Sequence, residues 1–111
     1  MKVGFIGLGA MGRHMARNLQ KSGNDMTVHD LRRDAATHIL ESGAEWADTP
    51  KEVAQKSEVI FTSLPGPIDV ESVVLGPDGI AEGIATGQIY LDLSTNSPTV
   101  TRRLHQNLAE R

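Results

Sequence analysis

Three glycines at a fixed spacing, Gly7-x-Gly9-x-x-Gly12, separate two segments of different hydrophobic pattern. The segment before them, residues 2–6, is short and mostly apolar, as in a buried β-strand. The segment after them, residues 10–22, has the periodicity of an amphipathic helix. Gly7 can make the tight turn out of the strand, Gly9 can let a pyrophosphate approach the backbone, and Gly12 can let the helix pack close to the sheet. This order of strand, glycines and helix is typical of a dinucleotide-binding loop.

The predicted helix carries its apolar residues on one stripe. Met11, Met15 and Leu19 follow one another at intervals of four, and Ser22-Gly23 supplies a stop. A second predicted strand ends in Asp30, 18 positions after Gly12, where an acid can accept hydrogen bonds from the adenosine ribose. The alternative is a glycine-rich turn between two packed elements. The matching strand, helix and acid favour dinucleotide binding.

Strand and helix patterns alternate along the chain, which predicts an α/β fold. We expect one dinucleotide-binding domain over residues 1–111, with a Rossmann-type, doubly wound parallel sheet of five strands in the order 3-2-1-4-5. Asp34 is a candidate N-cap for the second helix, and Thr49 with Glu52 forms a capping box for the third. The expected strands are about 2–6, 26–30, 45–47, 58–63 and 88–93, and the expected helices begin near residues 10, 34, 50, 68 and 97. The fourth strand is nearly all apolar, which predicts cover on both of its faces.

The cleft of such a sheet opens beyond the carboxyl ends of the strands, where the strand order reverses. Leu64-Pro65 follows the fourth strand and is either a plain turn or a wall of this cleft, and the topology favours the wall. Ser94 and Thr95 are predicted hydroxyl donors on the substrate side. The residues predicted to bind the cofactor are Gly7, Leu8, Gly9, Ala10, Met11, Gly12, Asp30, Leu31, Arg32, Leu64, Pro65, Asp69 and Thr95.

Two segments resemble a known family. Residues 5–19, which contain the three glycines, and residues 92–98, Asp-Leu-Ser-Thr-Asn-Ser-Pro, resemble signatures of the β-hydroxyacid dehydrogenases, and Leu64-Pro65 is a weaker third match. This family includes the 3-hydroxyisobutyrate, tartronate semialdehyde and 6-phosphogluconate enzymes. The resemblance implies the N-terminal NAD(P)-binding domain of an oxidoreductase that transfers hydride between a small 3-hydroxyacid and nicotinamide.

The same resemblance implies that a helical domain supplies the catalytic lysine and the main oligomer contacts. That domain is absent from this sequence, so we expect no catalytic residue in the chain and no turnover by it alone. Its own lysines, Lys2, Lys21, Lys51 and Lys56, are not expected near the nicotinamide. A non-catalytic dinucleotide-binding module and a purely structural role are the alternative functions.

NAD is the expected cofactor, and NADP is the alternative. Asp30 can accept hydrogen bonds from ribose hydroxyls, but its charge repels a 2′-phosphate. NADP-using members of the resembling family often have Asn followed by Arg here, whereas this chain has Asp30 followed by Leu31. The pair Arg32-Arg33 keeps NADP open, because either guanidinium could reach a phosphate.

Composition excludes several other classes of function. A net charge of −3 with few paired arginines argues against a general nucleic-acid binder, and no apolar run is long enough to span a membrane. The absence of cysteine excludes disulfides and thiolate metal sites and fits a cytoplasmic location. His14, His29, His38 and His105 are expected to be solvated or packed, with no metal site. The fifth strand is expected to be an open sheet edge through which the chain self-associates.

Overall fold

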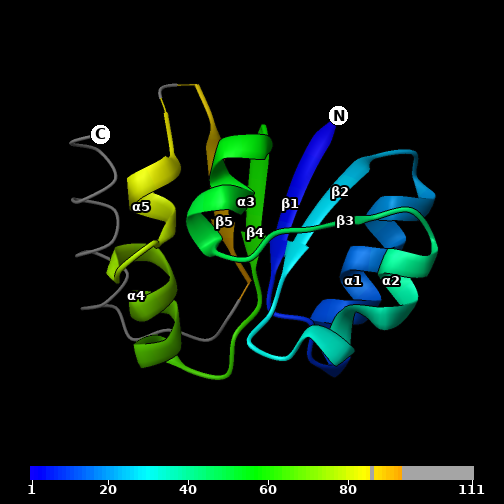
Figure 1. The fold of residues 1–111 in the computed structure, drawn as a ribbon, viewed down its shortest axis with the longest axis horizontal. Coiled ribbons are helices and arrows are strands. Elements are labelled where there is room, and N and C mark those ends of the chain that lie inside the picture. Colours follow the sequence, from blue (N-terminus) through cyan, green and yellow to red (C-terminus); the bar gives the residue numbers. More distant parts are fainter. Residues whose placement is uncertain (86, 94–111) are drawn as a thin grey trace.

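A computed structural model describes residues 1–85 and 87–93, and its ribbon is drawn in Figure 1. Its strands form one parallel sheet in the order β3-β2-β1-β4-β5. They are β1 (Lys2–Ile6), β2 (Asp25–His29), β3 (Glu45–Trp46), β4 (Val59–Thr62) and β5 (Ile89–Asp92). The predicted fold class and strand order are therefore confirmed. Ser94, Thr95 and the helix expected from Ser97 lie outside the described residues.

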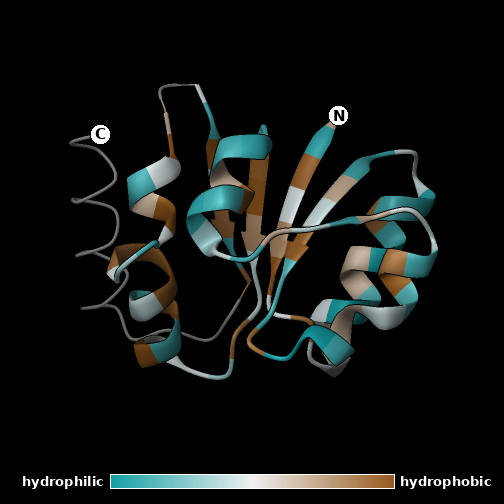
Figure 2. Cartoon of the chain, in the orientation of Figure 1, coloured by the Kyte–Doolittle hydropathy of each residue, from teal (hydrophilic) through white to brown (hydrophobic). Residues whose placement is uncertain are grey.

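Helices cover the sheet from both sides (Figure 1). They are α1 (Ala10–Lys21), the 3₁₀ helix η1 (Arg33–Ala36), α2 (Thr37–Glu41), α3 (Pro50–Lys56), α4 (Pro67–Leu75) and α5 (Ile80–Gly83). One core cluster packs Phe5 of the sheet with Ile39 of α2, and a second packs Ile60 with Val53 of α3 and Val70 of α4. Figure 2 shows the hydrophobic residues gathered on the strands between these helix layers. The sheet is thus held between two separate apolar cores, and its carboxyl edge is left for the site.

The predicted cap at Asp34 is wrong. Asp34 lies inside η1, and α2 begins only at Thr37, with no side-chain cap at its start. The Asp34 carboxylate accepts a hydrogen bond from the Arg32 guanidinium at 3.1 Å, while the Asp34 carbonyl accepts one from the Thr37 hydroxyl at 2.9 Å. A carboxylate held by a neighbouring arginine does not cap the helix, and the chain makes a tighter 3₁₀ turn first.

The two faces of β4 are covered unequally. Ile60 and Thr62 are buried under α3, α4 and α5, whereas Val59 and Phe61 on the opposite face are only half-buried. Their neighbours on β5, Ile89 (54% exposed) and Leu91 (46%), and Leu93 (38%), which directly follows β5, form what we call the β5 apolar row. Phe61 still packs against the core cluster that contains Phe5 and Ile39, with its ring stacked on that of Phe5. Among the described residues, the predicted cover is therefore complete on one face of β4 and partial on the other.

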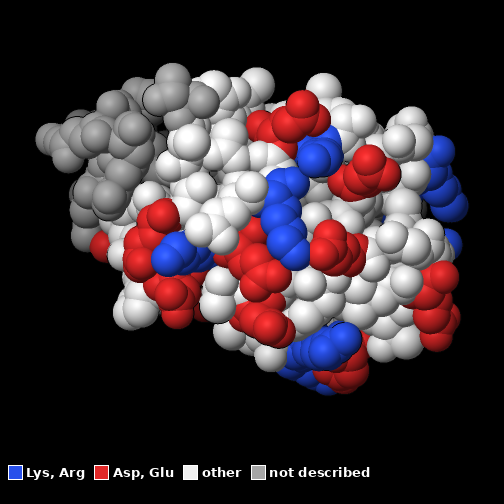
Figure 3. All heavy atoms as spheres, turned by 45° about the horizontal axis from the view of Figure 1, so that its top comes forward, with Lys and Arg blue, Asp and Glu red and all other residues white. Residues whose placement is uncertain are grey.

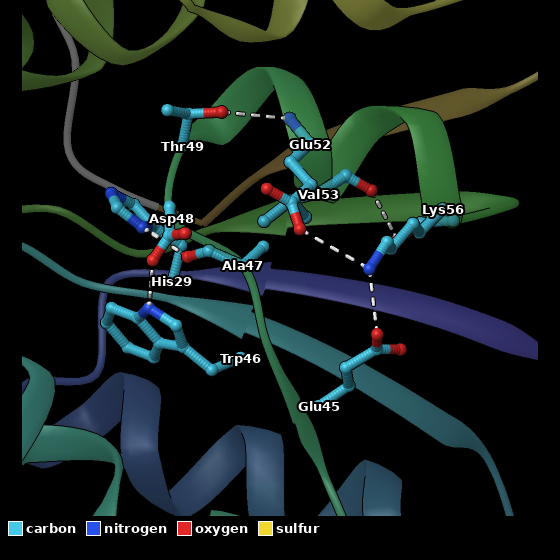
Figure 4. Close-up of polar contacts among 10 residues, drawn as sticks. His29, Glu45, Trp46, Ala47, Asp48, Thr49, Glu52, Val53 and Lys56 are labelled. Carbon is cyan, nitrogen blue, oxygen red and sulfur yellow. Dashed lines mark hydrogen bonds and ion pairs between the residues drawn. The ribbon is translucent and has the colours of Figure 1, made fainter.

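Helix α3 is anchored at both ends by polar contacts, drawn in Figure 4. The Thr49 hydroxyl accepts a hydrogen bond from the Glu52 N–H at 3.2 Å, with Pro50 in the first turn, as predicted, whereas the Glu52 carboxylate contacts Lys56 instead of closing the capping box. At the other end, Lys56 lies 2.7 Å from a Glu45 carboxylate oxygen and 3.3 Å from one of Glu52. Hydrogen bonds to Glu45 and then Glu52 raise the pKa of the exposed Lys56 ammonium. These contacts fix α3 against β3, beside one end of the cleft described below.

Removing the Thr49 cap should destabilise the domain modestly. We expect Thr49→Ala to lower the free energy of unfolding by about 1 kcal/mol, because the Glu52 N–H loses its acceptor. Urea denaturation followed by Trp46 fluorescence measures this difference. Thr49→Ser keeps the hydroxyl and should stay close to the parent chain. Equal stability of the Ala and Ser variants would contradict the capping role.

The surface carries charges of both signs. On the face drawn in Figure 3, lysine and arginine side chains lie interspersed with aspartates and glutamates. This arrangement differs from the continuous basic stripe that tracks a nucleic-acid backbone. No helix of the described chain is both long and apolar enough to cross a membrane.

Candidate functional site

A cleft of about 720 Å³ lies at the carboxyl edge of the sheet, where the strand order reverses between β1 and β4. Its walls come from the glycine loop, the segment after β2, the segment after β4 and helix α4. The predicted cofactor-binding residues that line it are Gly7, Gly9, Met11, Gly12, Asp30, Leu31, Arg32, Leu64, Pro65 and Asp69. The structure thus brings together in one cleft residues spread over more than sixty positions of sequence.

Leu8 is not among the residues that line the cleft. Leu8 is only 1% exposed, and its side chain packs in the core cluster beneath α1. Ala10 is the first residue of α1. Ser94 and Thr95 lie outside the described residues. Leu8 therefore contributes to the site through its backbone rather than its side chain.

Two of the three glycines are required by the fold itself. Gly7 has φ +97°, and a Cβ there would overlap the Ser63 carbonyl oxygen. A Cβ at Gly12 would overlap the carbonyl oxygen of Gly7. These two glycines let the end of β1, the start of α1 and the end of β4 approach one another closely.

Gly9 differs from its two neighbours. Its backbone angles, φ −64° and ψ −176°, suit any L-residue, and apart from its two neighbours in the chain no atom lies within 4 Å of the position that a Cβ would take. The fold therefore does not need a glycine at this position. What the missing side chain leaves is open space beside the start of α1.

The start of α1 is suited to an anion. The Arg13 N–H donates to the Gly9 carbonyl at 2.8 Å, so the N–H groups of residues 10–12 precede the first bond of the helix. No acidic side chain lies in this first turn. Free N–H groups and the positive end of the helix dipole stabilise a phosphate placed here.

Asp30 lies directly after β2 and is half-buried at the edge of the cleft. One of its carboxylate oxygens accepts a hydrogen bond from the Leu8 N–H at 2.6 Å, and the other accepts one from the Arg32 N–H at 2.9 Å. The Arg32 guanidinium lies 3.1 Å from an Asp34 carboxylate oxygen, and the Arg33 guanidinium lies 5.5 Å from the centre of the Trp46 ring. Asp30 is therefore the acid that these contacts hold at the edge of the cleft.

His29 is a cleft residue that sequence reasoning missed as such. It is 9% exposed, its Nδ1 lies 2.8 Å from the Ala47 carbonyl oxygen, and its ring packs against Trp46 (Figure 4). Because a carbonyl can only accept, Nδ1 carries the proton. The expected packing role agrees with these contacts, but the ring also borders the cleft, with Pro50, Val73 and Pro77 from α3, α4 and the loop after it. The alternating pattern of β2 predicts that His29 and Val28 lie on opposite faces of the sheet. It does not predict which residues of α3 and α4 lie beside the His29 ring.

Three polar side chains of β4 and β5, those of Thr62, Tyr90 and Asp92, form a hydrogen-bonded group outside the residues that line the cleft. The Thr62 hydroxyl donates to Asp92 at 2.9 Å, so the Tyr90 phenol 2.7 Å away must donate to Thr62. Burial raises the pKa of the Tyr90 phenol, so it stays protonated.

None of the four lysines lines the cleft. Among the described residues, no three histidine, aspartate or glutamate side chains are placed to hold a metal ion.

The sequence and fold match proteins of known kind. Residues 2–111 match the sequence model of a family described as the NAD binding domain of 6-phosphogluconate dehydrogenase. The chain belongs to this family. This NAD-binding domain is also 39% identical, over 92% of its length and 30% of the relative's, to mouse mitochondrial 3-hydroxyisobutyrate dehydrogenase. It is 38% identical, over 92% of its length and 34% of the relative's, to 3-sulfolactaldehyde reductase of Escherichia coli.

A solved structure with the same fold carries a cofactor. The protein Psf3, in complex with NADP⁺ and 2-OPP, matches the NAD-binding domain with a TM-score of 0.90 and 34% identity, over 97% of this chain and 38% of that one. The domain spans about a third of the length of the curated relatives it matches. The predicted resemblance to β-hydroxyacid dehydrogenases and the prediction of an NAD(P)-binding domain are therefore confirmed.

Proposed function

We propose that the domain binds NAD in this cleft and serves an oxidoreductase that transfers hydride between the cofactor and a small 3-hydroxyacid. The observation that carries the proposal is the open space at Gly9 beside the free N–H groups of α1. A helix start with room for a pyrophosphate is the part of a dinucleotide site that a packed turn lacks. The substrate class comes from the relatives, which are named for 3-hydroxyisobutyrate and 3-sulfolactaldehyde.

The proposed binding mode assigns the cleft from one end to the other. Residues 9–12 hold the pyrophosphate, and Asp30 accepts hydrogen bonds from the adenosine ribose. Adenine then lies beyond Asp30, near Leu31, Arg32, Leu64, Pro65 and Asp69, and against the apolar wall that His29 borders. Ser94 and Thr95 are assigned to the nicotinamide and substrate side by family resemblance. The resemblance to the family implies that a helical domain supplies the catalytic lysine.

NAD should bind more tightly than NADP, by about tenfold or more. The Asp30 carboxylate repels a 2′-phosphate, and Arg32 and Arg33 are engaged with Asp34 and Trp46. Titration with both cofactors, followed by Trp46 fluorescence and by calorimetry, tests the binding and the preference together. Trp46 is the only tryptophan of the chain and contacts His29, which borders the cleft.

Two outcomes of this titration contradict different claims. Tighter binding of NADP would overturn the cofactor preference and favour the alternative, which the NADP⁺ complex of Psf3 keeps open. Absence of binding by both cofactors would overturn the proposed function of the cleft.

Self-association is a further part of the proposal. β5 is the last strand of the described sheet, and its β5 apolar row is exposed. An open strand edge beside an apolar face favours pairing with a second copy. We expect the mean mass in sedimentation to rise with concentration, and Leu91→Glu to suppress this rise. Ile68→Glu, at an exposed apolar position on α4, is the control, and a concentration-independent monomer would contradict the expectation.

We expect the protein to bind neither nucleic acid nor membranes and to be located in the cytoplasm. Interspersed surface charge argues against a nucleic-acid partner, and no membrane partner is proposed. A cytoplasmic location stays a prediction.

A further inference from the structure

The Asp30 carboxylate makes two hydrogen bonds that need no cofactor. It joins Leu8 and Arg32, and the first bond, at 2.6 Å, spans 22 positions of sequence. Hydrogen bonds from N–H groups to a carboxylate are shorter and stronger than bonds between neutral groups. The residue assigned to the ribose is therefore already part of the architecture of the glycine loop.

Leu8 is the residue that the loop must hold in place. Its side chain is buried in the core beneath α1, and its N–H is held by Asp30. The preceding N–H, that of Gly7, donates to the His29 carbonyl at 3.0 Å. Two successive N–H groups of the loop thus donate to the end of β2. The loop is fixed just before α1 begins, and the N–H groups of the helix remain available to a phosphate.

A carboxylate can hold the loop and the ribose at the same time. It has about four lone-pair sites on two oxygens, and the backbone uses one site on each oxygen. The other sites remain for ribose hydroxyls. An asparagine offers a single acceptor oxygen, so it cannot replace both backbone bonds, and an alanine replaces neither.

We propose that Asp30 is a positioning residue for the pyrophosphate as well as the acceptor of the ribose, because it fastens the glycine loop through the Leu8 N–H. This inference rests on the proposed function of the cleft. It means that a change of Asp30 alters phosphate binding as well as the choice between NAD and NADP. A ligand that makes no ribose contact still depends on Asp30.

The test uses two ligands that differ only in the ribose. ADP carries the 2′- and 3′-hydroxyls, and 2′,3′-dideoxy-ADP lacks both. Calorimetry measures both ligands against wild type, Asp30→Asn and Asp30→Ala. The Asn and Ala variants have both lost the negative charge of Asp30. A difference in affinity between them therefore cannot come from weaker repulsion of the ligand phosphates. Asp25→Ala, at the far end of β2, is the matched control for loss of one carboxylate and should behave as wild type.

We expect Asp30→Ala to bind 2′,3′-dideoxy-ADP about tenfold more weakly than wild type, with Asp30→Asn in between. In the ligand-free protein, hydrogen exchange at the Leu8 amide should be faster in Asp30→Ala than in wild type, and intermediate in Asp30→Asn. Equal binding of the dideoxy ligand by wild type, Asn and Ala variants would overturn the inference, as would unchanged exchange at Leu8. The exchange measurement needs no ligand, so it tests the loop even if the proposed function of the cleft fails.

Discussion

The Gly9→Val variant should fold as the parent chain does and lose at least about a hundredfold in affinity for NAD, equivalent to about 2.7 kcal/mol. The backbone at Gly9 has φ −64° and ψ −176°, an extended conformation that β-branched residues adopt readily. Apart from the two adjacent residues, no protein atom lies within 4 Å of the new Cβ, so the Cβ itself meets no clash. The valine methyl groups instead occupy the space in front of the helix start, where the pyrophosphate must approach.

Calorimetric titration and thermal unfolding together separate these two effects. Gly9→Ala is a graded variant that fills less of the space and should lose less affinity. Gly12→Ala is the contrasting control, because its Cβ overlaps the Gly7 carbonyl oxygen. That overlap should destabilise the fold by about 1–3 kcal/mol, as forced overpacking does. Equal NAD affinity of wild type and Gly9→Val would contradict the assignment of the glycine loop.

The differences among the three glycines show which features of the site can be predicted from the sequence alone. Their spacing, followed by a helical period, was enough to predict the strand–loop–helix unit and, with the later strands, the sheet order. The sequence treats the three glycines alike as parts of one motif. Only the packing distinguishes them, because the atom that crowds Gly7 belongs to Ser63, more than fifty positions away. Packing in the folded chain, local at Gly12 and long-range at Gly7, decides which glycine serves the fold and which leaves space for a ligand.

The same limit applies at Asp30 and Asp34. From their spacing and neighbouring residues, the sequence predicts that Asp30 accepts hydrogen bonds from the ribose and that Asp34 caps a helix. The first assignment stays a prediction, and the second is wrong because Arg32 takes the Asp34 carboxylate. The bond between Asp30 and Leu8 joins two strand ends that only the folded sheet brings together. His29 was placed correctly on β2, but its position at the cleft depends on α3 and α4, which pack beside it only in the fold.

The 111-residue chain should bind NAD and still fail to oxidise any small 3-hydroxyacid. Hydride transfer from an alcohol needs a base within hydrogen-bond reach of the hydroxyl proton. The titratable groups that line the described cleft, His29, Asp30, Arg32 and Asp69, all lie at the proposed adenosine end, and the lysines do not line it. The part-buried Tyr90 phenol donates a hydrogen bond to Thr62, and burial raises its pKa, so it stays protonated and cannot act as a base near neutral pH.

Both large sources of catalysis should therefore be missing from this chain alone. A positioned base contributes about 10²–10⁴-fold, and correct orientation of the substrate can contribute about 7–11 kcal/mol. The assay follows NADH absorbance with a panel of small 3-hydroxyacids, after Trp46 fluorescence has established that NAD is bound. A chain extended with the helical domain of a family member is the positive control, and its Gly9→Val version measures the background. Robust turnover by the 111-residue chain would contradict the prediction and would require a base among its own residues.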